Sequence, residues 1–102
     1  MTDAEFLQEV KRSIHEIDPQ AEVWLFGSRA RGDAREDSDW DFLVLTDEPV
    51  DRAFKRRLRD HLYNVGFESG RVIGTVIQNK AVWEDLAVTD LYQNVREEGM
   101  LV

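Results

Sequence analysis

The stretch GSRARGDAREDSDWDFLV, residues 27 to 44, holds most of what the sequence says about the fold. It begins where the apolar run EVWLF, residues 22 to 26, stops at a glycine, and it closes inside a second apolar run, WDFLVL, residues 40 to 45. Short apolar runs bounded by turn residues are typical of buried strands. Residues 28 to 38 between them are small, charged and turn-forming, which predicts a loop with room for a helical turn.

The rest of the chain alternates helix and strand around this pair. Residues 3 to 18 repeat apolar side chains at helical spacing, with Asp3 as the expected N-cap and Pro19 as the stop. Further along we expect, in order, a helix from near Pro49 to Gly66 or Gly70, a strand over 71–78, a short helix from Asn79 through Leu86, and a helix over about 88–98 before Gly99. This order predicts one α/β (α+β) domain over residues 1–102, with helices covering a small mixed sheet of about three to four strands.

Composition narrows the classes of protein to consider. The 102 residues suit one domain, and the absence of cysteine excludes disulfides and thiolate metal sites. A net charge of −8 disfavours broad nucleic-acid binding, because such a surface repels phosphates. No apolar run reaches the length of a membrane span, and the acidic start MTDAEFLQEV lacks the features of a signal peptide. We therefore expect a cytoplasmic protein without a membrane segment.

Two carboxylates at the start of the second strand are the candidate metal ligands. Because side chains alternate across a strand, Asp39 and Asp41 share one face, whereas Trp40 and Phe42 point into the fold. Two carboxylates so close repel each other unless a cation sits between them. Magnesium favours one or two carboxylates together with substrate phosphate oxygens. The pair therefore predicts a metal site that is completed by a triphosphate.

The loop before the pair suits phosphate. Gly27 ends the first strand without a Cβ and lets a ligand approach the backbone, and Ser28 offers a hydroxyl and an amide. A helical turn over residues 28 to 32 would add free amides at its start. Arg29 and Arg31 supply positive charge, and Gly32 lets the loop turn away. We expect these residues to hold the nucleotide.

At this point the sequence resembles a known family. Gly27-Ser28, nine residues, then Ser38-Asp39-Trp40-Asp41 is similar to the signature of polymerase-beta-type nucleotidyltransferases, above all the minimal nucleotidyltransferases (MNT) of bacteria and archaea. The tail resembles one small subgroup through Trp83-Glu84, Tyr92-Gln93-Asn94-Val95 and Glu98-Gly99.

The resemblance implies the nucleotidyltransferase fold and the transfer of a nucleoside monophosphate from a triphosphate, ATP by preference, to a hydroxyl. It implies that Asp39 and Asp41 are catalytic and bind Mg²⁺ or Mn²⁺. Ser28 would then hold the β and γ phosphates, and Ser38 joins the nucleotide-binding set. Such catalysis consists mainly of positioning and electrostatics.

One position departs from the family pattern. Active members carry a third carboxylate on the third strand, but RVIGTVIQN contains no acid. The spacing places that position at Gly74, or alternatively at Thr75. Glu68 precedes the strand, and Glu84 and Asp85 follow it. Activity either survives on two ligands or is lost, which would leave a catalytically impaired nucleotide-binding module.

Partners follow from the resemblance as well. Family members occur as antitoxin-like partners of small helical HEPN-type proteins, and a domain of this size without an acceptor domain needs its acceptor on another chain. A homo-oligomer stays open. The basic segment from Arg52 to His61 predicts a solvated helix face or, less simply, a site for a phosphate-bearing acceptor or an acidic partner surface. Packing, rather than stacking on adenine, is the expected role of Trp24, Trp40 and Trp83.

Overall fold

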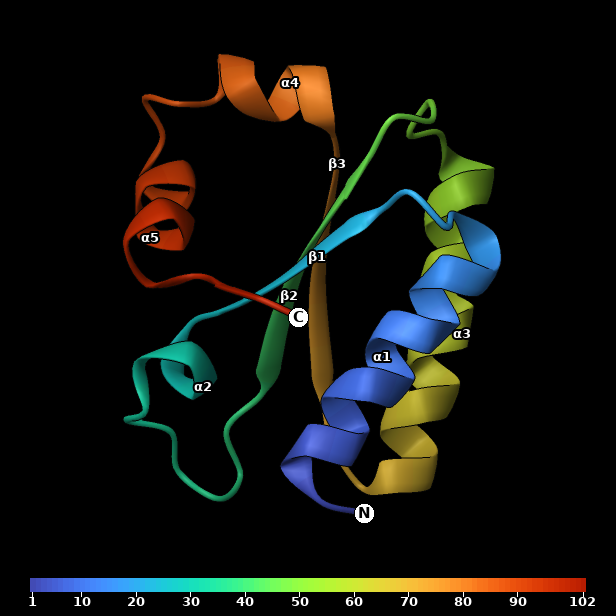
Figure 1. The fold of residues 1–102 in the computed structure, drawn as a ribbon, viewed down its shortest axis with the longest axis vertical. Coiled ribbons are helices and arrows are strands. Elements are labelled where there is room, and N and C mark those ends of the chain that lie inside the picture. The colour runs from blue at the N-terminus through green and yellow to red at the C-terminus, as the bar shows by residue number, and fades with distance from the viewer.

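The computed structural model describes residues 1–102, and its elements follow the expected alternation (Figure 1). The helices are α1 (Asp3–Ile17), α2 (Ser28–Arg31), α3 (Arg52–Ser69), α4 (Lys80–Asp85) and α5 (Asp90–Glu98). The strands are β1 (Glu22–Phe26), β2 (Trp40–Thr46), β3 (Ile73–Asn79) and β4 (Met100–Leu101). None of the helices combines the length and the apolar character that a membrane crossing requires.

The strands form one mixed sheet in the order β3-β2-β1-β4. β1 pairs antiparallel with β2 and with β4, whereas β2 and β3 run parallel because α3 connects them. This mixed α/β arrangement confirms the predicted fold class. The sequence did not predict the position of β4, a strand of two residues at the edge beside β1.

The sheet separates two apolar clusters, and alternation along β2 decides which side chain enters which. Helices α1 and α3 cover one face, where Phe6, Trp40, Phe42 and Leu58 are buried in the larger cluster (Figure 1). Helices α4 and α5 lie on the other face, where Leu43 belongs to the smaller cluster. Asp41 lies between Trp40 and Phe42 along β2 and therefore points to the α4–α5 side.

The helix ends correct one detail of the prediction and decide another. The N-cap of α1 is Thr2, not Asp3: its hydroxyl accepts from the Glu5 amide, and the Glu5 carboxylate accepts from the Thr2 amide in a capping box. Helix α3 ends at Gly70, whose φ of +70° suits a left-handed C-cap, whereas Gly66 is buried within the last turns. Asn79 caps α4 as predicted.

Candidate nucleotide site

Pairing of β1 with β2 brings the two halves of the motif together. Phe26, the last residue of β1, lies opposite Asp41 near the start of β2, so that Gly27 and Ser28 follow directly beside the carboxylates. Gly27 has a φ of +77°, a conformation that other residues rarely adopt, and this turns the chain from β1 into α2. The loop that follows Gly27 and the carboxylate pair thus lie at one end of adjacent strands.

The Asp41 carboxylate sits between two glycines on neighbouring strands. A Cβ at Gly27 would lie 2.5 Å from Oδ2 of Asp41, and a Cβ at Gly74 would lie 2.8 Å from Oδ1. Gly74 is also the register partner of Asp41 in the parallel β2–β3 pair. Both glycines therefore leave room that the carboxylate occupies, and a side chain at either position would force it to move.

The electrostatics of the pair favour a bound cation. Burial raises the pKa of Asp41 above its ordinary value, the negative charge of Asp39 raises it further, and Arg31 opposes both effects. Asp39 is exposed at the mouth of the site. A cation between the carboxylates would relieve both their repulsion and the cost of burying Asp41.

Arg29 holds the loop together. Its guanidinium donates to the carbonyl oxygen of Ser38 at 3.0 and 3.3 Å and to that of Glu36 at 3.0 Å, and it lies 4.6 Å from the ring centroid of Trp40. The Ser38 hydroxyl accepts from the Arg35 amide at 2.8 Å. In this arrangement Arg29 and Ser38 shape the loop that presents Asp39. Trp40 is only 5% exposed, so it packs in the core and cannot stack on adenine.

Arg31 acts on Asp41 through its positive charge and is itself held by acids. Its guanidinium donates to Asp33 at 3.1 Å and to Glu98 of α5 at 3.2 Å. Glu98 belongs to the tail that resembles the family subgroup, and no local sequence pattern predicts a contact with Arg31 across 67 positions. Ser28 stands at the start of α2, where its carbonyl oxygen accepts from the Gly32 amide and its hydroxyl makes no hydrogen bond within the chain. The Ser28 hydroxyl is therefore available to a ligand.

The third strand contributes no carboxylate to the site. Gly74 lies on the Asp41 face, whereas Thr75 faces α3 on the opposite side of the sheet. Glu68 belongs to α3, and Glu84 and Asp85 belong to α4, so no acid stands on β3. No three His, Asp or Glu side chains gather closely enough to hold a metal by themselves. Two carboxylates still fit magnesium, which commonly takes its remaining ligands from water and substrate phosphates.

Comparison with known proteins gives the family. Residues 7–100 match the model of the nucleotidyltransferase domain family. The chain belongs to this family. It is 37% identical over 57 residues to a protein of Haemophilus influenzae assigned as the protein adenylyltransferase MntA, a match over 56% of this chain and only 50% of that protein. It is 30% identical over 80 residues to a protein of Methanocaldococcus jannaschii assigned as a protein adenylyltransferase, over 78% of this chain and 75% of the other.

Solved structures agree on the fold. A structure assigned as a minimal nucleotidyltransferase superposes with a TM-score of 0.65 at 28% identity, covering 99% of this chain and 97% of the other. This confirms the predicted resemblance to MNT-type, polymerase-beta-like nucleotidyltransferases. An MNT antitoxin, solved with a tri-AMPylated HEPN toxin of Shewanella oneidensis, has a TM-score of 0.64 at 16% identity, over 98% and 71% of the two chains. At that identity the likeness concerns the fold alone.

Proposed function

We propose that this nucleotidyltransferase domain binds a magnesium nucleoside triphosphate, ATP by preference, and transfers its nucleoside monophosphate inefficiently to a hydroxyl of a partner protein. The observation that carries the proposal is the position of Asp41: it lies beside Asp39 and Gly27-Ser28 but opposite a glycine on β3. The first half of this arrangement suits metal and phosphate, and the second half lacks the expected acid.

Each residue of the site has a role in this proposal. Asp39 and Asp41 would hold the divalent ion, which when bound neutralises charge on the phosphates. Ser28 would donate its hydroxyl to the β or γ phosphate, since no other group in the chain uses it. Gly27 leaves the room that the Asp41 carboxylate needs in order to stand beside the loop. Arg31 would add positive charge, although Asp33 and Glu98 already balance much of it.

The transfer itself is a displacement at phosphorus. The acceptor oxygen forms a bond to the α-phosphorus, the bond from that phosphorus to the bridging oxygen breaks, and pyrophosphate leaves with the electron pair. The proton of the acceptor hydroxyl goes to water, because Gly74 offers no base on the β3 side. A positioned base contributes about 10²- to 10⁴-fold in rate, so transfer by this chain is expected to be slow.

The acceptor is proposed to lie on a HEPN-type helical protein. The curated relatives are assigned as protein adenylyltransferases, and a structural neighbour was solved with an AMPylated HEPN toxin. A cytoplasmic location would supply both ATP and such a partner. Gly74 also supports a second function, in which the chain is an antitoxin-like module that binds nucleotide and partner without useful turnover.

One experiment separates these functions. The wild-type chain is incubated with ATP labelled at the α-phosphate, Mg²⁺ and a lysate of the source cells, and labelled protein is detected after denaturing electrophoresis. A faint labelled band that is absent with Asp39→Asn/Asp41→Asn supports slow transfer by this site. Kinases transfer the unlabelled γ-phosphate and give no band, and the double variant controls for other enzymes in the lysate that transfer AMP.

Two other results bear on the proposal. Retained Mg²⁺-ATP binding with no labelled band at any chain concentration would favour the binding module over the transferase. Rapid labelling by the wild-type chain would contradict the account of Gly74 and would mean that Glu68, Glu84 or the partner supplies the missing acid.

A further inference from the structure

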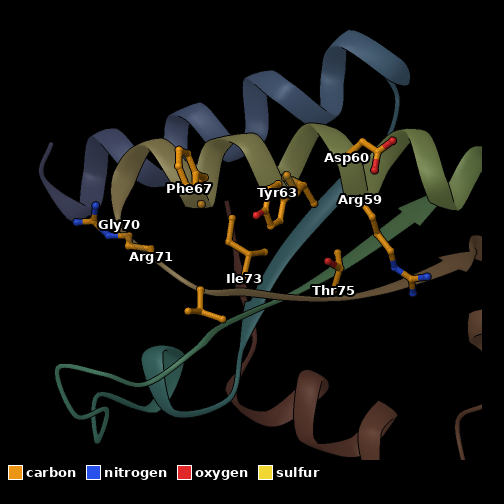
Figure 2. Close-up of a pocket in the computed structure, with 11 residues that line it drawn as sticks. Arg59, Asp60, Tyr63, Phe67, Gly70, Arg71, Ile73 and Thr75 are labelled. Carbon is orange, nitrogen blue, oxygen red and sulfur yellow. The ribbon is translucent and has the colours of Figure 1, made fainter.

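A groove of about 650 Å³ runs between α3 and the edge strand β3, on the sheet face opposite Asp41 (Figure 2). Tyr63 and Phe67 of α3 form one side of it, and Ile73 and Thr75 of β3 form the other. Arg59 lies at the end of the groove near Thr75, and Phe67 lies toward the opposite end, near Gly70. None of these side chains belongs to the nucleotide site.

Large apolar side chains at one end of the groove are unusually exposed to solvent. Tyr63 is 71% exposed, Phe67 is 78% exposed, and neighbouring Val72 is 63% exposed. The rings of Tyr63 and Phe67 stack on each other with centroids 6.4 Å apart. Apolar side chains gathered in this way, beside a groove, commonly mark a surface that another molecule covers.

One face of α3, called the stripe below, presents both positive charge and aromatic rings to the groove. Arg52, Arg56 and Arg59 precede Tyr63 and Phe67 at intervals of three and four residues, which places all five on one helix face. A hollow lined by Arg52, Arg56 and Arg59, with Asp51 and Lys55 beside them, continues the groove at its basic end. The stripe thus changes from three arginines to two aromatic rings along its length.

The arginines of the stripe have no partner within the chain. No carboxylate lies within ion-pair distance of Arg52, Arg56 or Arg59, although the protein carries a net charge of −8. Asp60 lines the groove beside Arg59 but forms no ion pair with it. By contrast Arg71, near the aromatic end, is bound to Asp3 at 2.9 Å. Unpaired positive charge in an acidic protein suits an acidic ligand.

The strand that borders the groove has an unprotected edge. β3 lies at the end of the sheet and pairs only with β2, so one side of its backbone has no strand partner. Its sequence, IGTVIQN, has no charged residue and no proline, the devices that usually prevent an edge from pairing with another chain. The opposite edge, β4, is only two residues long.

We propose that this groove binds an extended segment of a partner protein, which pairs with the β3 edge and carries apolar residues at one end and a row of Asp or Glu at the other. Apolar side chains of the segment would cover Tyr63 and Phe67, and its carboxylates would meet Arg59, Arg56 and Arg52. Strand addition of this kind takes its affinity from backbone hydrogen bonds and its specificity from side-chain pockets. The inference stands independently of catalysis at Asp41.

Two other occupants fit the surface less well. A second copy docked through the same groove would add a second stripe of three arginines to the interface, and its β3 strand carries no acid to meet them. Single-stranded nucleic acid would use the arginines and rings, but the net charge of −8 repels its phosphates. Only the acidic, extended protein segment matches both the charge and the free edge.

The test uses two fluorescein-labelled peptides, one with four alternating Val and Thr residues before four Asp and Glu residues, and one with the two halves reversed. The two orders allow for a parallel or an antiparallel strand. Binding is measured by fluorescence anisotropy, and the site is located by amide shifts in the ¹⁵N-labelled chain. We expect one peptide to bind and to shift amides along β3 and the Tyr63–Phe67 turn.

Charge-reversal variants measure how much the arginines of the stripe contribute to peptide binding. Arg56→Glu with Arg59→Glu should weaken binding at least about tenfold, as expected for close charge pairs at an interface. Arg59→Glu alone and Arg57→Glu form the matched pair, because they make the same charge change on the same helix, one on the stripe and one off it, and Arg57→Glu should change affinity little. Circular dichroism of each variant verifies that α3 is intact.

Three results would overturn the proposal. The first is no binding of either peptide at millimolar concentration, and the second is equal loss in Arg57→Glu. The third is that a labelled oligo-dT strand, or a second copy of the chain seen by analytical ultracentrifugation, occupies the same amides more tightly than the peptides do.

Discussion

The two sides of Asp41 differ in the functional groups that they place beside its carboxylate. On the β1–β2 side the chain places Gly27, Ser28 and Asp39 next to the carboxylate, and Arg29 braces the loop through the carbonyl oxygen of Ser38. On the β3 side the neighbour of Asp41 is Gly74, and the next residue, Thr75, faces the opposite side of the sheet. One side has the groups for metal and phosphate, whereas the other lacks a group for the acceptor.

This difference separates binding from transfer in physical terms. Holding a magnesium triphosphate needs carboxylates and hydrogen-bond donors, which the β1–β2 side supplies. Transfer also needs the acceptor oxygen to be deprotonated or held in line, which is the work of a group on the β3 side. Substitutions on one side at a time therefore separate binding from transfer.

The largest effect is expected from restoring the acid. Gly74→Asp should raise the rate of nucleotidyl transfer, by up to about 10²- to 10⁴-fold, because a carboxylate there would complete the acceptor side. Its Cβ would approach Oδ1 of Asp41, 2.8 Å away, so the flexible Asp41 carboxylate must rotate. The measurement is labelled product formed per chain with ATP and Mg²⁺ in excess.

Thr75→Asp is the matched control for that gain. The change adds the same acid one residue later, but the side chain faces the groove under α3. No gain in transfer is expected. Equal gains in both variants would show that added negative charge alone, and not its place beside Asp41, stimulates the reaction.

The next effect concerns the carboxylate pair. Asp39→Asn with Asp41→Asn should weaken Mg²⁺-dependent ATP binding by at least about 100-fold, since even outer-shell groups of metal sites cost 10- to 100-fold when they are removed. Calorimetry in the presence of Mg²⁺ measures it. Asp37→Asn, in the same exposed loop, is the control and should bind as wild type does. Unchanged affinity in the double variant would refute the site assignment.

A smaller loss of nucleotide affinity is expected from a substitution at Ser28. Ser28→Ala removes a hydroxyl that has no other hydrogen-bond partner, so the fold should keep its stability. The affinity for the triphosphate should fall by about 1 to 3 kcal/mol, the range for a hydrogen bond to a charged group. Binding of AMP, which lacks the β and γ phosphates, should hardly change. A covalent nucleotide adduct on Ser28 by mass spectrometry would contradict the role of a phosphate donor.

The smallest effect is on stability and follows from the pKa of Asp41. Because burial and Asp39 raise that pKa in the folded chain, the folded state holds the proton more tightly than the unfolded state does. Stability contributed by this group is therefore lost as pH rises from the ordinary carboxyl value of about 4 through the raised one. The charged Asp41 thus destabilises the nucleotide-free fold at neutral pH.

Asp41→Asn should accordingly raise the melting temperature at pH 7, by no more than about 2 °C, since solvent screens part of the carboxylate. The rise should shrink as the pH approaches about 4, where aspartate takes up its proton. Thermal unfolding followed by circular dichroism at both pH values measures it. A lower melting temperature at pH 7 would indicate that Asp41 stabilises the fold.

Much of the fold could be predicted because the signals were local. Helical spacing in α1 and the apolar runs of β1 and β2 each lie within one element. Asn79 was expected to cap α4 and does so. The N-cap of α1 was missed because Thr2 and Asp3 both suit that position. The end of α3 was left open between Gly66 and Gly70, and only the backbone geometry decides for Gly70.

The candidate site was predictable only in part. Period-two alternation placed Asp39 and Asp41 on one face, but the same rule could not choose between Gly74 and Thr75 without the register of β3 against β2. The ion pair of Arg31 with Glu98 joins α2 to α5 and depends on tertiary packing. The contacts of Arg29 with the Trp40 ring and with the loop carbonyl oxygens also depend on tertiary packing and could not be predicted from the sequence.

The most direct test of the central claim is a calorimetric titration of the wild-type chain with ATP, first with Mg²⁺ and then with the divalent ions chelated. If Asp39 and Asp41 form a metal site that the triphosphate completes, ATP binds with Mg²⁺, and the affinity falls by at least about tenfold without it. Equal affinity in both titrations, or no binding of ATP in the presence of Mg²⁺, would contradict the account.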